Sequence, residues 1–321
     1  MNVIHFRLIP KSPTVTPWRG DTLVGHLLWA YAYQYGSTEM DDLFARISLP
    51  CHGNENTGPP IVSDLFPENY LPIPLLPAFS KSDESKELAL ANRKAIKKIR
   101  WIPIDDWETL RDHLTPTSLY NTLMSIDPKK LEDDTKVAES AELHASINRL
   151  NGTTSEAGGL YARVVRREVR PLHGYLYRGA LGEDAFELLR QVGESGYGAD
   201  ASTGCGQFDI VRLEEENWNQ PNAKYNGWMS LGRHLPDAKC DPRAAKYRLV
   251  THYGRLGGSL ANRRYVFKKP ILLCETGSLW KESFSNDRFP GFMLDKTVRN
   301  TDLDVRHLAY TLPYWLNWEN K

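Results

Sequence analysis

The chain has 321 residues, a length that accommodates two ordinary domains, each able to bury its own hydrophobic core. Its 40 basic residues balance its 40 acidic residues, which excludes a free-standing protein that holds nucleic acid through bulk positive charge; a phosphate-bearing partner must be met by a local patch. Residues 1–10 are too short and too alternating for a signal peptide, and no long apolar run follows, so we expect a soluble, cytoplasmic protein.

The cysteines are widely spaced, without a C-x-x-C pair or neighbouring paired histidines. This pattern indicates neither a zinc site nor a disulfide framework, and we expect free thiols in a reducing cytoplasm and no cofactor. The four positions are Cys51, Cys205, Cys240 and Cys274.

A strand and a helix open the chain. Residues 2–9 alternate in the manner of a half-buried strand, which Pro10 ends. Asp21 is a favourable N-cap for a helix over residues 22–35, which carries an apolar stripe and stops at Gly36.

Arg19 and Gly20 stand just before that helix, whose first free amides and dipole favour a bound anion. The guanidinium of Arg19 adds further donors, so the sequence predicts an anion site here. The alternative is that Arg19 pairs with a carboxylate on the protein surface.

An insertion over about residues 37–142 interrupts the first domain. Residues 37–79 are rich in proline but apolar enough to be packed down, so we expect an ordered, irregular segment. Residues 128–142 are acidic and polar, and we expect them to be flexible.

Residues 80–100, within the insertion, are highly charged. Lys94, Lys97 and Lys98 fall on one side of a predicted helix with Trp101 close by. This arrangement is typical of a solvated helix face, and it also suits a surface that follows phosphates.

Strand-like segments follow at residues 160–165 and 172–177, then a helix-like segment at 183–192 and a strand-like one at 207–213. The order strand, helix, insertion, strand, strand, helix, strand is that of a ferredoxin-like split βαβ, which predicts an α+β first domain over residues 1–215. Arginines add positive charge to a face or rim of its sheet. They are Arg149, Arg163, Arg166, Arg167, Arg170 and Arg178.

Residues 194–206 join that helix to the last strand and contain Gly196, Gly198, Gly204 and Gly206. Glycine accepts backbone angles that a Cβ forbids, so this glycine loop can present bare amides to a phosphate or ribose. The alternative is a helix C-cap followed by a tight turn. Because the loop follows a helix and enters a strand, it matches neither a dinucleotide fingerprint nor a P-loop.

The predicted second domain covers residues 216–321. Its strand-like pieces lie at residues 228–231, 247–253, 271–274 and 307–316.

Residues 242–274 form a basic window without Asp or Glu. Tyr253, Tyr265 and Phe267 interleave with the charges, a mixture that single-stranded RNA binding uses, although such aromatic residues are also common in the core of a sheet. The basic residues are Arg243, Lys246, Arg248, Arg255, Arg263, Arg264, Lys268 and Lys269.

No dedicated catalytic motif is present: the sequence contains no H-E-x-x-H, no G-x-S-x-G and no P-loop. The histidines are scattered. His26 on the first helix and His144 near Arg149 are candidates for a general acid or base, and a hydrogen-bonded structural role is the alternative for each.

Five segments occur in an order that resembles one family. They are residues 19–30 (RGDTLVGHLLWA), 61–72 (IVSDLFPENYLP), 148–161 (NRLNGTTSEAGGLY), the glycine loop and 268–278 (KKPILLCETGS). Together they resemble the fourth subunits of the Csm effector complex of type III-A CRISPR–Cas systems, which belong to the RAMP superfamily. The resemblance spans nearly the whole chain.

The resemblance implies two ferredoxin-like (RRM-like) domains that hold the repeat-derived 5′ handle of the CRISPR RNA. It also implies contacts with the large polymerase-like subunit and with the adjacent RAMP backbone subunit, in a ribonucleoprotein of antiviral defence. The family is regarded as non-catalytic, which agrees with the missing motifs. The insertion would correspond to the family's protruding thumb.

Carried over by position, the resemblance implies an RNA-binding set from both domains. In the glycine loop, Ala199, Asp200 and Ala201 stand where many relatives carry a cation, and Gln207 likewise replaces one, so the grip would rest on backbone donors and neighbouring charges. The implied set is Arg19, Gly20, His26, Arg149, Arg163, Gly196, Tyr197, Gly198, Ser202, Thr203, Gly204, Arg255, Lys268 and Lys269.

Two alternatives stay open. The first is that the chain is a related RAMP endoribonuclease that processes precursor CRISPR RNA, with His26 or His144 as general acid or base. The second is that it is the corresponding subunit of another type III subtype.

Overall fold

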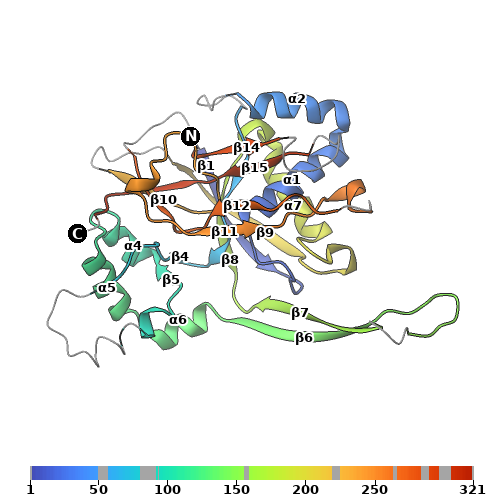
Figure 1. Cartoon of the computed structure of the whole chain (residues 1–321), viewed down its shortest axis with the longest axis horizontal. Helices are drawn as coiled ribbons and strands as arrows, with labels where there is room; N and C mark the ends of the chain where they lie inside the picture. Colours follow the sequence, from blue (N-terminus) through green and yellow to red (C-terminus); the bar gives the residue numbers. More distant parts are fainter. Residues whose placement is uncertain are drawn as a thin grey trace.

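The structure is a computed structural model that describes residues 2–49, 57–79, 92, 94–154, 159–218, 225–262, 266–282, 289–295 and 305–319. Sheets form the middle of the molecule, helices lie at both of its ends, and one long hairpin leaves the body (Figure 1).

The main sheet is built around β1 (Asn2–Pro10), which lies antiparallel between β8 (Leu172–Tyr177) and β9 (Phe208–Asn217). Two short strands, β2 (Ile61–Val62) and β3 (Phe66–Pro67), pair with β8. The strand order is therefore β2-β8-β1-β9, with β3 also on β8. Strands were predicted at the positions of β1, β8 and β9, and these predictions are confirmed.

Two helices, α1 (Gly20–Tyr35) and α7 (Asp184–Ser195), contact each other and share a core with the sheet. Alternate residues of β1 point at them, and each helix supplies one apolar stripe, as its sequence spacing predicts. The two helices are thereby fixed on the sheet. Buried members of this core are Ile4, Phe6, Leu8, Leu23, Leu27, Leu188, Leu189 and Val192.

The predicted N-cap of α1 is wrong. The helix begins at Gly20, Arg19 occupies the cap position, and Asp21 lies in the first turn. The Gly20 amide donates instead to the carboxylate of Asp64 at 2.9 Å. A distant side chain thus replaces the local cap that the sequence suggested.

The second strand-like segment of the first domain lies outside the main sheet. Residues 160–165 belong to β7 (Leu160–Glu168), which pairs in full register with β6 (Val137–Ala145) to form the hairpin that projects from the body in Figure 1. Every residue of β8 is buried, so its partner must be apolar on both faces. Ile61, Val62 and Phe66 meet that need and take the place beside β8.

The insertion is more regular than expected. Residues 37–47 form a helix, α2 (Ser37–Ile47), and β6 extends the order into residues 137–145. Residues 128–134 form α6 (Pro128–Asp134), because Asp127 caps its amides and Pro128 suits the first turn. The expectation of a flexible segment at 128–142 is therefore wrong. Residues 80–91 lie outside the described residues.

The rest of the insertion forms a small helical unit at one end of the molecule (Figure 1). A strand pair comes first, β4 (Tyr70–Pro72) with β5 (Trp101–Pro103), and the helices α4 (Ile104–Leu110) and α5 (Pro116–Ser125) follow. Within the described residues, the helices are all too short or too polar to cross a membrane.

The C-terminal part contains strands where they were predicted. They form a three-stranded sheet and two pairs. Across the described part of residues 225–319 the other regular elements are short 3-10 turns, so the helices of the expected second ferredoxin-like domain are not among them. The strands are β10 (Gly227–Ser230) between β13 (Leu279–Lys281) and β16 (Pro313–Leu316), β11 (Leu249–His252) with β12 (Ile271–Cys274), and β14 (Gly291–Leu294) with β15 (His307–Tyr310).

Candidate nucleic-acid interface

The glycine loop joins α7 to β9, and the Tyr197 amide closes it by donating to the Gly206 carbonyl at 2.9 Å. The Gly196 amide ends α7 by donating to the Val192 carbonyl at 2.8 Å, and the Gly206 amide donates to the Pro13 carbonyl at 2.8 Å. A Cβ on Gly206 would lie 2.2 Å from the carbonyl oxygen of Tyr197. The loop's own backbone therefore requires these glycines.

Two amides expected to face a ligand are already bonded. The Gly198 amide donates to Nε2 of His26, and the Ala199 amide donates to Oγ1 of Thr16, each at 2.9 Å. The expectation that the loop presents bare amides is therefore wrong at these two positions. Gly198 instead ties the loop to α1.

Tyr197 anchors the loop inside the protein. Its ring is fully buried and stacks on Trp18 at a centroid distance of 4.6 Å. Its hydroxyl donates to the Pro17 carbonyl at 2.7 Å and accepts from the Arg19 amide at 2.9 Å. Burial raises the pKa of this hydroxyl well above its ordinary value. Tyr197 thus offers no ring to a ligand.

The exposed tip of the loop surrounds a 3-10 turn, η2 (Ala201–Thr203). Ser202, Thr203 and Gly204 are exposed there. The Thr203 hydroxyl donates to the Asp200 carbonyl at 2.9 Å, which leaves the Ser202 hydroxyl as the simplest donor for an outside partner.

Arg163 of β7 links the hairpin to this tip. One terminal nitrogen contacts the Asp200 carboxylate at 2.7 Å and the other contacts Glu142 at 2.8 Å. The hydrogen bonds to these carboxylates raise the pKa of Arg163. Arg163 therefore holds two protein segments together, with its charge paired.

The predicted anion site at the start of α1 is filled by the protein itself. Arg19 pairs with Asp64 at 2.6 Å, and the side chain of Asp64 is 3% exposed. The hydroxyl of Thr276 donates to the same carboxylate at 2.5 Å. The attraction of Asp64 raises the pKa of Arg19. Arg19 therefore pairs with a carboxylate, as the alternative held, but that carboxylate is buried and not on the protein surface.

His26 is a partly buried hydrogen-bond acceptor. Burial lowers its pKa to about 4, so the ring is neutral near pH 7, and its Nε2 accepts the Gly198 amide. An imidazole whose acceptor nitrogen is occupied by the backbone is poorly placed to take a proton from a substrate.

The two adjacent lysines of the C-terminal part differ in environment. Lys268 is largely enclosed, its Nζ donates to the Arg306 carbonyl at 3.1 Å, and burial lowers its pKa to about 8. Lys269 is exposed. Only Lys269 of the pair is placed to meet a phosphate in solvent.

Exposed aromatic and basic side chains meet on two neighbouring backbone segments beyond β11 and β12. Tyr253 is 68% exposed and Phe267 is 64% exposed. Arg255 and Phe267 form a backbone bridge, and the Lys268 amide donates to the Gly254 carbonyl at 2.8 Å, so the segments run side by side. We call Tyr253, Arg255, Phe267 and Lys269 the interleaved surface. Arg263, Arg264 and Tyr265 lie outside the described residues.

Helix α1 supports both the glycine loop and Gly257, which lies between Arg255 and Phe267 of the interleaved surface in sequence. Its His26 bonds to the loop, and its Trp29 packs so closely on Gly257 that a Cβ there would lie 2.6 Å from the indole nitrogen. Figure 1 shows both segments at the α1 end of the molecule. Tertiary packing thus joins pieces that are some 60 positions apart in sequence.

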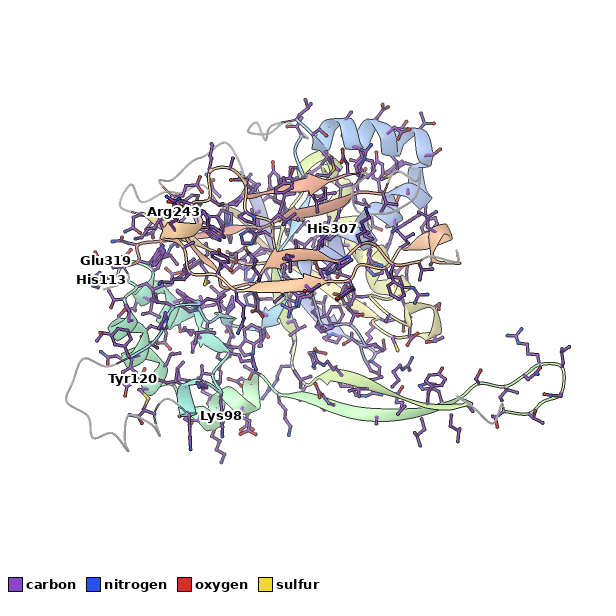
Figure 2. All side chains as sticks on the ribbon, viewed as in Figure 1. Lys98, His113, Tyr120, Arg243, His307 and Glu319 are labelled. Atoms are coloured by element: carbon purple, nitrogen blue, oxygen red, sulfur yellow. The ribbon has the colours of Figure 1, made fainter. Side chains whose placement is uncertain are left out.

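Arg149 and the lysines of the insertion lie elsewhere. Arg149 is exposed in the turn that closes the projecting hairpin. Lys94, Lys97 and Lys98 are exposed, and Figure 2 shows Lys98 beside the helical unit. Trp101 is partly buried, and its ring packs edge-on against Phe66.

The hairpin carries apolar side chains that sequence reasoning did not single out. The exposed fractions are 83% for Leu143, 97% for Leu150 and 75% for Leu160. The alternation of apolar and polar residues over 137–145 is the signal that could have predicted this strand. The acidic composition of the stretch obscured it.

Comparison with known proteins gives a match at the level of the fold. No protein-family profile and no curated protein matches the sequence. A chain of the Csm1–Csm4 cassette in complex with cA3 is 18% identical, covers 100% of both chains and has a TM-score of 0.57. A chain of the Csm3–Csm4 subcomplex in the type III-A CRISPR–Cas interference complex is 17% identical, covers 99% of this chain and 100% of that chain, and has a TM-score of 0.57.

Csm4 is the component that both structures share by name. The full-length match in fold agrees with the family that the sequence motifs resemble. This chain has the fold of the Csm4 component found in the Csm1–Csm4 cassette and in the Csm3–Csm4 subcomplex.

Proposed function

We propose that this chain is a non-catalytic, RNA-binding subunit of a type III CRISPR effector ribonucleoprotein. It would hold the 5′ repeat-derived handle of the CRISPR RNA and bridge the large polymerase-like subunit to the adjacent RAMP backbone subunit. The shared fold supports this proposal, since the similar structures pair Csm4 with Csm1 in one case and with Csm3 in the other.

We infer further that the main sheet is ferredoxin-like. The order β2-β8-β1-β9, with α1 after the first strand and α7 before the last, is the order of a split βαβ unit. The division into residues 1–215 and 216–321 belongs to the same proposal. The second buried cluster draws residues from both parts, among them Val3, Ile61, Met229 and Trp318, so the two parts would act as one rigid platform.

The interleaved surface is the observation that carries RNA binding. Tyr253 and Phe267 present open ring faces on which bases can stack, and Arg255 and Lys269 supply cations for the backbone. Residues 242–274 contain no Asp or Glu, so this segment contributes only basic charge although the whole chain is neutral.

The other residues of the implied set divide by accessibility. Ser202, Thr203 and Gly204 at the loop tip, and Arg149 on the hairpin, would contact RNA directly. The remaining members position these groups from inside the protein or through paired charges. They are Arg19, Gly20, His26, Arg163, Gly196, Tyr197, Gly198 and Lys268.

A general acid or base is poorly supported at both histidine candidates. His26 is partly buried, and its Nε2 accepts a hydrogen bond from the Gly198 amide. His144 lies on the hairpin with its ring stacked on Tyr161 at 5.4 Å and its Nε2 3.7 Å from Glu142. These contacts suit structural roles and favour the non-catalytic assignment over the endoribonuclease.

The test is to purify the full chain and incubate it with handle-bearing repeat RNA in EDTA. We expect RNA retention without cleavage, and co-purification of the large and backbone subunits when these are co-expressed. Site-specific cleavage that is lost in His26→Ala or His144→Ala would overturn the non-catalytic assignment. Retention no better than that of a scrambled RNA of equal length would overturn the handle-binding assignment.

A further inference from the structure

Three side chains of the metal-ligand type meet beside α1, from three distant segments. Asp21 lies in the first turn of α1, His252 ends β11, and His307 begins β15. Their ligand atoms all lie within 4.8 Å of one another. Nδ1 of His252 is 3.5 Å from Oδ2 of Asp21, and the two imidazole rings are 5.1 Å apart. His307 is buried, and Figure 2 labels it near the middle of the view.

Two of these ligand atoms are buried without a hydrogen-bond partner among the described residues. They are Oδ2 of Asp21, on a side chain that is 2% exposed, and Nε2 of His307, a residue that is 6% exposed. The other oxygen of Asp21 accepts the Thr22 amide at 2.7 Å. A buried polar atom without a partner is destabilising, and two such atoms in one cluster require a common explanation.

Two cations face the cluster, Lys268 and Arg233. Lys268 gives Oδ2 of Asp21 no hydrogen bond among the described residues, and its Nζ donates to the Arg306 carbonyl. The positive charges of Lys268 and Arg233 repel a weakly held ion such as Ca²⁺. Ca²⁺ in addition prefers oxygen ligands to imidazole nitrogens. Two imidazoles and one carboxylate are instead the ligands of a borderline divalent ion such as Zn²⁺.

We propose that Asp21, His252 and His307 bind one Zn²⁺ or a similar borderline divalent ion, which ties α1 to β11 and β15. The separation of 3.5 Å between the Asp21 and His252 ligand atoms matches one edge of a tetrahedron with metal–ligand bonds of about 2.0–2.1 Å. The side chain of His252 is 16% exposed, so a water molecule can complete the coordination.

The ion would have a structural consequence. His252 directly precedes Tyr253 of the interleaved surface, and Asp21 belongs to the helix that supports the glycine loop. Coordination of one ion by both Asp21 and His252 would therefore fix the interleaved surface relative to α1. The metal site itself does not depend on the RNA-binding function.

The test is metal binding by the full chain. After treatment with a chelator and its removal, we expect one Zn²⁺ per chain by calorimetry and elemental analysis, together with a rise in the thermal midpoint. We expect Asp21→Asn and His307→Gln each to weaken Zn²⁺ binding at least tenfold. His113→Gln should bind as the wild type does, because His113 is exposed at the far end of the molecule (Figure 2).

A second measurement needs no variant. Co²⁺ in the wild-type chain should give the intense visible absorption of a four-coordinate site, and Zn²⁺ should displace it. Lys268→Met should strengthen Zn²⁺ binding, because it removes a facing cation. Absence of stoichiometric Zn²⁺ and of the Co²⁺ absorption in the wild type, or equal Zn²⁺ binding by the wild type and folded Asp21→Asn, would overturn the proposal.

Discussion

The Gly198 amide donates a 2.9 Å hydrogen bond to Nε2 of His26. Gly198 and His26 were predicted from the sequence as separate RNA contacts, but this hydrogen bond gives them a shared structural role. Since the amide and the imidazole satisfy each other, the glycine loop is attached to α1 before any ligand arrives. The parts of the loop that remain available are at its tip.

Replacing Gly198 with valine should destabilise the fold. Its φ of 76° costs about 1–2 kcal/mol for a residue with a Cβ, and that Cβ would lie 2.6 Å from Thr16. Gly204→Val is the matched control, since its φ of 91° is similar but a Cβ there meets open space. Urea unfolding should show a clearly larger loss for Gly198→Val, and equal losses would contradict the packing argument.

Removing the exposed rings should weaken RNA binding. Tyr253→Ala and Phe267→Ala should each cost about 1–3 kcal/mol of stacking, which is roughly a 5- to 150-fold increase in Kd for handle-bearing RNA. Fluorescence anisotropy measures this change. Both side chains are more than half exposed, so the thermal midpoint should barely move. Unchanged affinity in the double variant would show that the interleaved surface does not bind the RNA.

Removing the exposed cations should flatten the salt dependence. For a single strand each lost phosphate contact lowers the slope of log K against log salt by about 0.7, so Arg255→Gln with Lys269→Gln should lower it by about 1.4. Arg243→Gln is the control, because it removes an exposed cation of the same basic window near the opposite end of the molecule (Figure 2). A slope change as large in the control would show that only bulk charge matters.

Breaking the Arg163 bridge should loosen the loop tip while preserving the fold. In Arg163→Gln the contacts to Asp200 and Glu142 are lost, so amides near residue 200 should exchange hydrogen faster. Asp200→Asn should give the same local change, because it removes the other member of the pair. Protection that stays at the wild-type level in both variants would mean that the bridge does not restrain the tip.

Acid should destabilise the fold through its buried histidines. Burial lowers the pKa of His26, His173 and His234 from 6.5 to about 4 in the folded state. The unfolded chain then binds more protons between these values, so stability falls as pH decreases from 6.5 towards about 4. Each histidine contributes about 1.4 kcal/mol per pH unit in this window. Unfolding free energies that stay constant over it would contradict the burial of these rings.

The sequence by itself determined the local elements that have a strong period. The alternation of β1, the apolar stripe of α1 and the glycine that ends it, and the strands near residues 172, 208, 228 and 271 all lie where the pattern predicts them. These signals succeed because one buried face fixes the spacing of apolar residues along the chain. The motifs that resemble the family predicted the overall fold, and the full-length structural match supports that prediction.

Only the tertiary structure decided which residues satisfy one another. Asp64 closes the start of α1 from 44 positions away, the Ile61–Phe66 region displaces β7 from the main sheet, and Lys268 turns inward while Lys269 faces solvent. Local sequence carries no record of such partners, because a buried charge or amide selects whichever group folding brings within hydrogen-bond distance. For the same reason the cluster of Asp21, His252 and His307 has no motif and becomes visible only in three dimensions.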